Sequence, residues 1–273
     1  MNDHDAPDRN GMPGLGLGTW QNDEPDACAE SVATALEAGY RHVDTAQIYG
    51  NEAAVGRGIE AADVDREEVF LATKVWIDRL APEDVLDSTE ESLEKLGTEY
   101  VDLLYVHWPA GEYDPEATLP AFETLQEDGR IDRIGVSNFE PSHIEAAQSV
   151  LDAPIFANQV EIHPLLQQRE LRAVCADAGI ELVAYSPLAR GDVLDVDVLS
   201  AIAADRGVSE AQVSLAWLRA KGITPIPKAT GADHIRDNWA SLGLELTDAE
   251  IDRIDALDAD RRLVDPDFAP AAW

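Results

Sequence analysis

Apolar residues along this chain alternate between a helical and an extended spacing. Within 26–38, Val32 and Leu36 lie four positions apart with Ala29 one turn before them, and Gly39 follows, which predicts an amphipathic helix with a glycine stop. By the same pattern, helices are expected at Asp26–Ala38, Ala53–Ala61, Pro82–Leu96, Phe122–Glu127, Arg169–Ala178, Ala211–Lys221 and Asp248–Leu257. Short apolar runs between them predict strands at Tyr40–Thr45, Val69–Val75, Val101–His107, Arg133–Val136, Phe156–Val160, Glu181–Tyr185 and Thr224–Pro227.

A short eighth strand is expected near Ser241–Leu244. Strands that alternate with helices indicate a parallel sheet, and eight units in about 230 residues fit a closed barrel better than an open sheet. We therefore predict an α/β fold, a (β/α)8 TIM barrel, with a short N-terminal β-hairpin formed by Met12–Gln21. Residues 1–10 are expected to be a mobile acidic tail, and residues 11–273 a single barrel domain.

The glycines of this hairpin resemble a dinucleotide-binding fingerprint but do not complete it. Gly14, Gly16 and Gly18 are followed by Thr19, where the G-x-G-x-x-G motif needs its last glycine. The motif also requires a strand before it and a helix after it. A Rossmann fold is therefore not supported.

Composition narrows the function classes. The chain has 54 acidic and 20 basic residues, a net charge of −34, and this excess argues against nucleic acid as a partner. It contains no apolar run of about 18 residues that would span a membrane, and its acidic start is unlike a signal peptide. We expect a cytoplasmic protein with an acidic surface adapted to molar salt (a halophilic protein), or, less well supported, with an acidic partner-binding surface. Cys28 and Cys175 are expected to be buried thiols, and no histidine cluster indicates a metal site.

Groups that can transfer protons follow several predicted strands. Asp44 ends the first strand with Tyr49 beyond it, Lys74 ends the next, and His107 the third. In a barrel, the carboxyl ends of the strands meet at one mouth. A phenol has a pKa of about 10, but one ammonium at about 4 Å is worth roughly 4 kcal/mol, or some three pKa units. We expect Lys74 to lower the pKa of Tyr49, Asp44 to hold Lys74, and His107 to bond a substrate oxygen.

Simpler interpretations exist for each residue. Asp44 could cap the next helix while Tyr49 packs, and His107 could bond a loop carbonyl. Lys74 could instead form a Schiff base, as in an aldolase. All four residues falling at strand ends by chance is improbable, which favours the catalytic interpretation.

Motifs along most of the chain resemble those of the aldo-keto reductase family, from about Met12 to Asp258. They are G-L-G-T-W at 16–20, H-V-D-T-A-x-x-Y-G-N-E at 42–52, T-K-V-W at 73–76, D-L-L-Y-V-H-W-P at 102–109, G-V-S-N-F at 135–139, N-Q-V-E-I-H-P at 158–164, A-Y-S-P-L-A-R-G at 184–191 and I-P-K-A-T at 226–230. The resemblance implies hydride transfer from NADP(H) or NAD(H) to a small aldehyde or ketone, with Tyr49 as general acid. Lys74 and Asp44 would tune that acid, and His107 would orient the carbonyl.

The resemblance also implies a cofactor site. Its residues would be Thr19, Trp20, Asp44, Ser137, Asn138, Gln159, Tyr185, Ser186, Pro187, Leu188, Arg190, Lys228, Ala229, His234, Asp237 and Asn238. Among them, the carboxamide would contact Ser137, Asn138 and Gln159, and the nicotinamide ring would stack on Tyr185. The substrate pocket would be lined by Trp20, Tyr49, Trp76, His107 and Trp108, although each tryptophan could simply belong to the core.

Two positions depart from the family's NADPH-preferring pattern. Ala229 stands where a Ser or Thr is usual, and His234 where an Arg is usual, so a bidentate guanidinium for the 2′-phosphate is missing. Lys228 could still pair with that phosphate. We therefore expect both cofactors to be usable, with a weaker preference for NADPH.

Substrate choice in this family depends on segments that are short here, Pro109–Thr118 and Arg261–Trp273. An open pocket for 2-oxoaldehydes or keto-sugars is expected, in a protein that we expect to be a monomer. Two alternatives stay open: a Schiff-base lyase using Lys74, and a regulatory barrel that binds cofactor without turnover.

Overall fold

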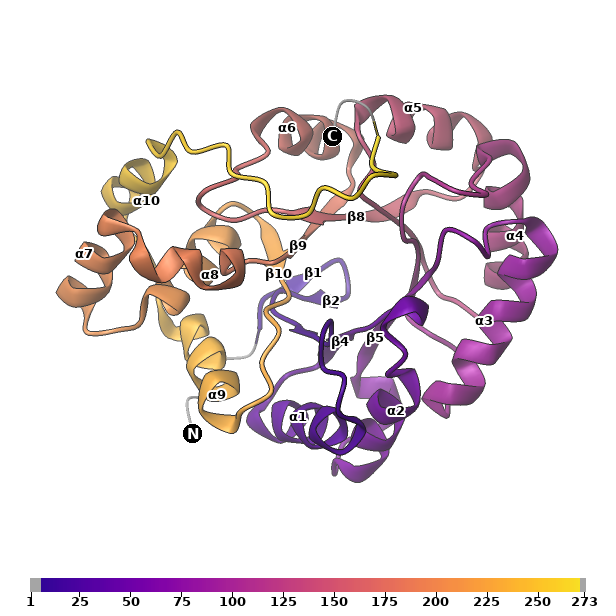
Figure 1. Ribbon diagram of the computed structural model, residues 1–273, viewed down its shortest axis with the longest axis horizontal. Helices are drawn as coiled ribbons and strands as arrows, with labels where there is room; N and C mark the ends of the chain where they lie inside the picture. The colour runs from indigo at the N-terminus through magenta and orange to yellow at the C-terminus, as the bar shows by residue number, and fades with distance from the viewer. Residues whose placement is uncertain (1–5, 271–273) are drawn as a thin grey trace.

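The computed structural model describes residues 6–270, so the parts of the predicted tail at 1–5 and of the C-terminal segment at 271–273 lie outside the described residues. Among the described residues, the main sheet has eight strands, each parallel to the next along the chain (Figure 1). They are β3 (Leu17–Gly18), β4 (His42–Asp44), β5 (Phe70–Val75), β6 (Leu103–Val106), β7 (Ile134–Ser137), β8 (Ile155–Glu161), β9 (Glu181–Tyr185) and β10 (Ile223–Pro225). This confirms the predicted (β/α)8 fold.

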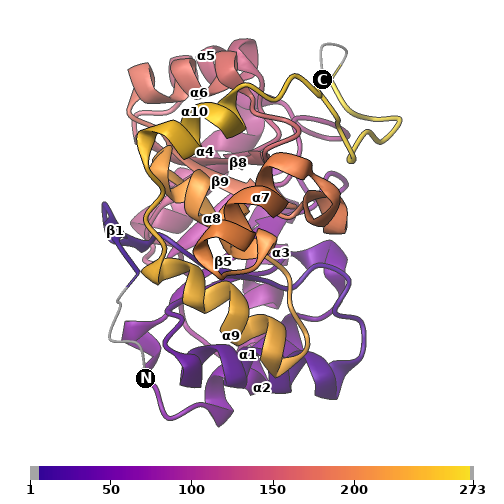
Figure 2. The same ribbon diagram turned by 90° about the vertical axis from the view of Figure 1, so that its left-hand side faces the viewer.

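Helices surround the strands on the outside (Figures 1 and 2). They are α1 (Pro25–Ala38), α2 (Glu52–Ala61), α3 (Pro82–Leu96), α4 (Pro115–Glu127), α5 (Pro141–Val150), α6 (Arg169–Ala178), α7 (Asp197–Arg206), α8 (Glu210–Ala220), α9 (Ala232–Ala240) and α10 (Asp248–Asp255). Short 3-10 turns occur at η1 (Gln47–Tyr49), η2 (Arg66–Glu68), η3 (Ala189–Asp195) and η4 (Ser241–Gly243). Helices α5, α7 and α9 are additional to those predicted. Each buries only two or three residues, so its apolar pattern is too short to detect.

The prediction of the eighth strand was wrong. Ser241–Gly243 forms the 3-10 turn η4, whereas Leu17–Gly18 forms the barrel strand β3. Backbone hydrogen bonds from Gly16 N to Pro225 O (3.0 Å) and Gly18 N to Pro227 O (3.2 Å) join β3 to the chain beside β10 and close the barrel. A Cβ on Gly18 would lie 2.7 Å from the carbonyl oxygen of Ile226, so this close approach requires glycine. Glycine gives no strand signal, which explains the error.

The N-terminal hairpin is present, but it lies earlier than expected. Strand β1 (Asp8–Arg9) pairs with β2 (Met12–Pro13) in an antiparallel ribbon. Part of the segment predicted to be a tail is therefore a strand. Cys28 and Cys175 are free and buried, as predicted.

The strands direct alternate side chains into the barrel, and this alternation places the polar residues at its mouth. On β5, Phe70 and Ala72 belong to the apolar cluster inside the barrel, whereas Leu71 and Val75 belong to the core under the helices. Because side chains two apart share a face, Lys74 continues the inward row at the carboxyl end. The same parity applies on β8, where Ala157 lies in the inner cluster and precedes Gln159 and Glu161.

Candidate active site

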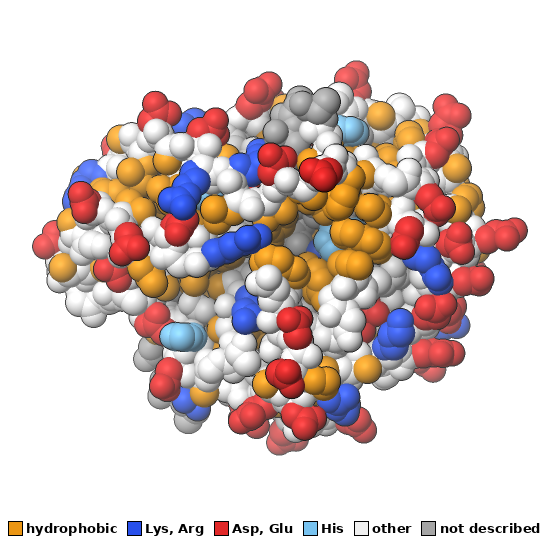
Figure 3. All heavy atoms as spheres, viewed as in Figure 1, with side chains coloured by type: hydrophobic (Ala, Val, Ile, Leu, Met, Phe, Trp, Pro, Cys, Tyr) orange, Lys and Arg blue, Asp and Glu red, His pale blue; other side chains and the backbone are white. Residues whose placement is uncertain are grey.

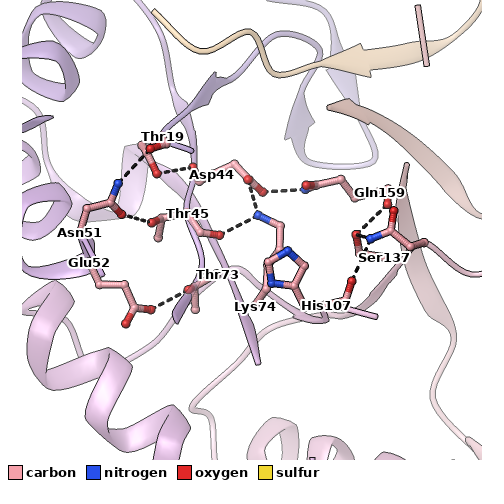
Figure 4. Close-up of polar contacts among 11 residues, drawn as sticks. Thr19, Asp44, Thr45, Asn51, Glu52, Thr73, Lys74, His107, Ser137 and Gln159 are labelled. Carbon is pink, nitrogen blue, oxygen red and sulfur yellow. Dashed lines mark hydrogen bonds and ion pairs between the residues drawn. The ribbon is translucent and has the colours of Figure 1, made fainter. Parts of the chain in front are cut away.

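An ion pair between β4 and β5 lies at the centre of the barrel mouth. Lys74 Nζ donates to Asp44 Oδ1 at 2.5 Å and to the backbone oxygen of Thr45 at 2.7 Å (Figure 4). Lys74 is fully buried and Asp44 nearly so. Burial lowers the pKa of Lys74, and the adjacent carboxylate opposes that shift. The predicted contact between Asp44 and Lys74 is therefore present.

The second carboxylate oxygen of Asp44 connects the pair to the opposite wall of the barrel. Gln159 Nε2 donates to Asp44 Oδ2 at 2.7 Å, and the backbone oxygen of Gln159 accepts the Ser137 hydroxyl at 2.8 Å and the Asn138 N–H at 3.0 Å. Asn138 Nδ2 also donates to the backbone oxygen of His107 at 3.0 Å. Residues from β4, β7 and β8 thus form one hydrogen-bonded layer (Figure 4). Each carboxylate oxygen of Asp44 is thus held by a hydrogen-bond donor, Oδ1 by Lys74 and Oδ2 by Gln159.

Tyr49 ends the turn η1 and is half-buried beside this pair. The Lys74 ammonium lies 5.1 Å from the centroid of its ring. Burial raises the pKa of Tyr49 well above its usual value, and the charge on Asp44 adds to that shift. The predicted lowering of this pKa by Lys74 was wrong, because burial of the phenol and the charge on Asp44 outweigh the effect of the ammonium. The hydroxyl therefore stays protonated throughout the neutral pH range.

His107 follows β6 and borders the same space. Its ring centroid lies 5.8 Å from that of Tyr49 and 4.9 Å from that of Trp76, both in edge-on arrangements. Burial lowers the pKa of His107 well below its usual value, and the Lys74 charge acts in the same direction. The imidazole is therefore neutral at pH 7. Its Nδ1 has no hydrogen-bond partner among the described residues.

A set of buried polar residues supports the loop that carries Tyr49, and sequence reasoning gave three of them, Asn51, Glu52 and Thr73, no role. Asn51 Nδ2 donates to the backbone oxygen of Thr19 at 2.9 Å, and Asn51 Oδ1 accepts the Thr45 hydroxyl at 2.9 Å. Thr73 Oγ1 donates to Glu52 Oε1 at 2.7 Å (Figure 4). A buried carboxylate needs such partners, and the position of Glu52 in the first turn of α2 was the signal that could have identified it.

Beyond the network, Asn138 follows β7 and Ser186 follows β9. Both have left-handed backbones, with φ of 63° and 47°, a conformation that non-glycine residues seldom adopt and that is concentrated at functional sites. The half-buried Tyr185 donates its hydroxyl to Asn138 Oδ1 at 2.8 Å. The backbone oxygen of Pro187 accepts the Ser214 hydroxyl at 2.7 Å, which ties the chain before Leu188 to α8.

The residues predicted to contact the remainder of a dinucleotide lie on three separate elements. Arg190, in η3, places its guanidinium 4.8 Å from the centroid of the Trp20 ring. Lys228 is exposed and forms a parallel bridge with Gly18, while Ala229 next to it is buried. On α9, the candidate residues are the exposed His234, the half-buried Asp237 and the buried Asn238.

Asp237 differs from the other candidates on α9 because its carboxylate already has partners. It accepts the Ser209 hydroxyl and the Gln212 amide, each at 2.6 Å. An adenine at this position would meet a carboxylate that α8 holds in place.

Aromatic side chains form an apolar wall at the mouth. Trp108 is buried, and Phe268 meets it edge-on at 5.4 Å between ring centroids and meets Trp76 at 5.7 Å. Figure 3 shows hydrophobic side chains gathered around a central hollow on this face. Sequence reasoning assigned substrate choice to the C-terminal segment but did not single out Phe268, although it is the one aromatic residue in 261–270.

Residues 6–270 contain neither a membrane-spanning helix nor a metal-binding cluster. No helix in this range is long and apolar enough to cross a membrane. No group of three or more His, Cys, Asp or Glu side chains in this range could hold a metal ion.

Comparison with known proteins gives a consistent result. The model of the aldo/keto reductase family matches residues 11–259. A glyoxal reductase of Bacillus subtilis is 42% identical over 252 residues, which is 92% of this chain and 91% of that protein.

Solved structures match along nearly the whole chain. The crystal structure of a proposed 2,5-diketo-D-gluconic acid reductase B superposes with a TM-score of 0.94 at 35% identity, covering 99% of this chain and 97% of the other. An aldo-keto reductase from Bombyx mori in complex with NADP gives a TM-score of 0.89 at 34% identity, covering 96% and 95%.

Proposed function

Because the chain belongs to the aldo/keto reductase family, we propose that it reduces small aldehydes and ketones with NADPH or NADH and that Tyr49 donates the proton. The observation that carries the proposal is the position of Tyr49 between His107 and the buried Lys74–Asp44 pair. A protonated hydroxyl, a neutral imidazole and a fixed ion pair therefore lie together at one apolar mouth.

The residues present fit a nicotinamide cofactor. The Asn138 carboxamide and the Ser137 hydroxyl would be the groups that exchange hydrogen bonds with the carboxamide of such a ring, and the half-buried Tyr185 would offer a flat surface for stacking. The exposed amine of Lys228 can pair with a phosphate. When bound, the reduced nicotinamide supplies a hydride to the carbonyl carbon.

Tyr49 supplies the matching proton. Its raised pKa keeps the hydroxyl protonated at neutral pH, as an acid requires. The oxygen that receives the proton develops alkoxide character, and an alkoxide is far more basic than a phenolate because an alcohol is about as weak an acid as water. The phenol therefore need not be unusually acidic to donate in the transition state.

The neighbours of Tyr49 orient and stabilise the reacting groups. His107 is neutral, so it can donate one N–H to the carbonyl oxygen without adding a charge to the buried site. The Lys74 ammonium, held by Asp44, stabilises the phenolate that remains after proton transfer, which then returns to the phenol by taking a proton from water. Asp44 and Gln159 thereby act on the reaction through the position of Lys74.

The geometry does not favour the Schiff-base alternative. A lysine that attacks a carbonyl must reach it as a free amine. Lys74 is instead fully buried and donates to Asp44 and Thr45. No specific contact favours a regulatory barrel without turnover, and an assay of cofactor oxidation distinguishes it from the reductase.

We infer that the substrates are small 2-oxoaldehydes, dialdehydes or keto-sugars. The inference is supported by the names of the relatives, a glyoxal reductase and a proposed diketogluconic acid reductase. It is also supported by the short connection between β6, which ends at Val106, and α4, which begins at Pro115, because a short connection has few residues with which to cover a pocket.

We also propose that the protein works as a monomer in a cytoplasm rich in salt. The support is its net charge of −34 and the acidic side chains around the rim of the face in Figure 3. At about 1 M salt, repulsion between such charges is screened to about 3 Å.

The experiment follows oxidation of NADPH and of NADH separately, with methylglyoxal as acceptor in molar KCl, for the wild type and Tyr49→Phe. The wild type should turn over, and the variant should lose about 100-fold or more in kcat with unchanged cofactor binding, because it keeps the ring and lacks only the acid. A wild type that binds cofactor without consuming it would overturn the proposal in favour of the regulatory barrel.

A further inference from the structure

The C-terminal segment, residues 258–270, passes over the mouth of the barrel without forming a helix or strand. Figure 1 shows it leaving α10 and passing α6 and β8. Figure 2 shows the same yellow segment in the view turned by 90°. With no helix or strand of its own, its backbone must find partners elsewhere. Arg261 N donates to the backbone oxygen of Leu165 at 2.8 Å, where the crossing begins.

The next partner of the segment is a single carboxylate. Leu263 N donates to Glu161 Oε1 and Val264 N donates to Glu161 Oε2, each at 2.8 Å. Glu161 is fully buried, and His163 Nε2 lies 2.9 Å from its Oε1. A buried carboxylate is very costly without hydrogen-bond donors, so the two amides of the segment and Glu161 depend on each other.

Glu161 stands on the same strand, and on the same face, as a residue of the active-site layer. It follows Gln159 by two positions on β8, and Gln159 donates to Asp44. The segment is therefore fixed relative to the catalytic carboxylate through one short piece of strand. The segment also forms an ion pair between Arg261 and Asp192. This pair is partly exposed to water and contributes little to holding the segment in place.

What the segment carries to the mouth is Phe268. Its ring packs edge-on against Trp76 and Trp108, yet the residue remains 37% exposed. A large aromatic residue that is only partly covered by its own protein leaves apolar surface available to a ligand. Trp76, in turn, packs against His107.

We propose that Glu161 is a positioning residue for substrate binding: its carboxylate holds the C-terminal segment so that Phe268 forms one wall of the pocket for aldehydes with an aromatic group beyond the carbonyl. The inference rests on the proposed reductase activity and names the device that shapes its pocket. The contact between Glu161 and the amides of Leu263 and Val264 is called the clamp below. A small acceptor does not reach Phe268, so the clamp does not affect its binding.

Three substitutions distinguish the role of the clamp from that of the pocket wall formed by Phe268. Glu161→Gln keeps the size of the side chain but turns an N–H₂ group toward one of the two amide donors. Val264→Pro removes one of those donors and leaves Glu161 intact, so it serves if the first variant does not fold. Phe268→Ala removes the wall itself. The matched control is Glu123→Gln, because Glu123 Oε1 also accepts two successive backbone N–H groups, those of Asp152 and Ala153, between α4 and the loop after α5.

For 4-nitrobenzaldehyde, the KM should rise about tenfold in Glu161→Gln, Val264→Pro and Phe268→Ala, while the KM for methylglyoxal stays within about twofold of the wild type. The double variant Glu161→Gln/Phe268→Ala should show no further rise, since both changes remove the same contact. Glu123→Gln should leave both KM values unchanged. Additive effects in the double variant, or an unchanged KM in both clamp variants, would overturn the proposal.

Amide hydrogen exchange tests the clamp without any turnover. Exchange of the Leu263 and Val264 amides should quicken at least tenfold in Glu161→Gln and stay slow in Glu123→Gln, which should instead release Asp152 and Ala153. If the wild type reduces no aldehyde, the proposed function fails while this measurement still decides on the clamp. Unchanged protection of the Leu263 and Val264 amides in Glu161→Gln would show that Glu161 does not hold the C-terminal segment.

Discussion

Lys74 Nζ lies 2.5 Å from Asp44 Oδ1, and the two side chains are 0% and 2% exposed, so the ion pair is enclosed by protein. Removing two charges from water is costly, and the pair is stable only because Thr45 and Gln159 provide further hydrogen bonds. Such a pair contributes a fixed field at the mouth, at a cost in folding free energy that an apolar pair would not carry.

Asp44→Asn should lower the free energy of unfolding by about 3 kcal/mol or more, because Lys74 would remain buried without its counter-charge. Chemical denaturation followed by circular dichroism measures this loss. Glu91→Gln is the control, since Glu91 pairs with Arg79 on the surface and its loss should cost no more than about 1 kcal/mol. Equal losses in the two variants would show that the pair in the barrel is not the stronger constraint.

His42 gives the stability a pH dependence that can be measured by itself. Burial lowers the pKa of His42 from 6.5 to about 4, so between these values the unfolded chain binds a proton that the native protein excludes. Stability from this residue is complete above pH 6.5 and is lost as the pH falls toward 4, by about 3 kcal/mol.

Carboxylates titrate in the same range, so the comparison with His42→Phe isolates the effect of the imidazole. The gap in unfolding free energy between wild type and variant should change by about 3 kcal/mol from pH 7 to pH 4, to the disadvantage of the wild type. A constant gap over this range would contradict the assignment. The phenyl ring has a similar size and keeps the contact with Phe70.

Barrel closure depends on the lack of a side chain at residue 18. In Gly18→Ala the new Cβ would lie 2.7 Å from the Ile226 oxygen, and the backbone must shift, which should cost about 1–3 kcal/mol of stability. Gly231→Ala meets no atom within 4 Å and has a φ that alanine accepts, so it should be nearly neutral. Thermal unfolding of the two variants provides the test, and the prediction fails if they melt together.

Cofactor preference should respond to position 234. The exposed His234 on α9 lacks the forked guanidinium that pairs with a phosphate, so His234→Arg should lower the KM for NADPH about tenfold and leave that for NADH unchanged. His234→Lys adds the charge without the fork and should give a smaller gain. If Lys and Arg are equivalent, charge alone sets the preference. If neither changes the KM, residue 234 does not reach the phosphate.

The placement of the catalytic candidates could be predicted from the sequence because it follows from two regular features, strand order and side-chain alternation. Asp44, Lys74 and His107 each end a strand whose apolar pattern is clear, so they were expected at one mouth. Gly18 could not be assigned to the barrel in the same way, since its strand is identified by a close backbone contact with residue 226.

Quantities that depend on distances were not available from the pattern. Lys74 was expected to acidify Tyr49, but burial of the phenol and the nearby charge on Asp44 raise its pKa instead, and neither effect can be read from the pattern. Glu161 and Phe268 are far apart in the chain, and the amides that join Glu161 to the C-terminal segment have no side-chain signature.

The closure of the barrel also sets an order for its synthesis. Strand β3 leaves the ribosome early, yet its partner on the open side is the chain at residues 225–228, near the end of the barrel. At roughly 5–20 residues per second, β3 waits on the order of ten to forty seconds for that partner. During this interval the nascent sheet has an open edge at β3, which in a crowded cell can pair with other chains. Pairing of β3 with the chain after β10 removes this edge, so the barrel is complete only once residues 225–228 have been made.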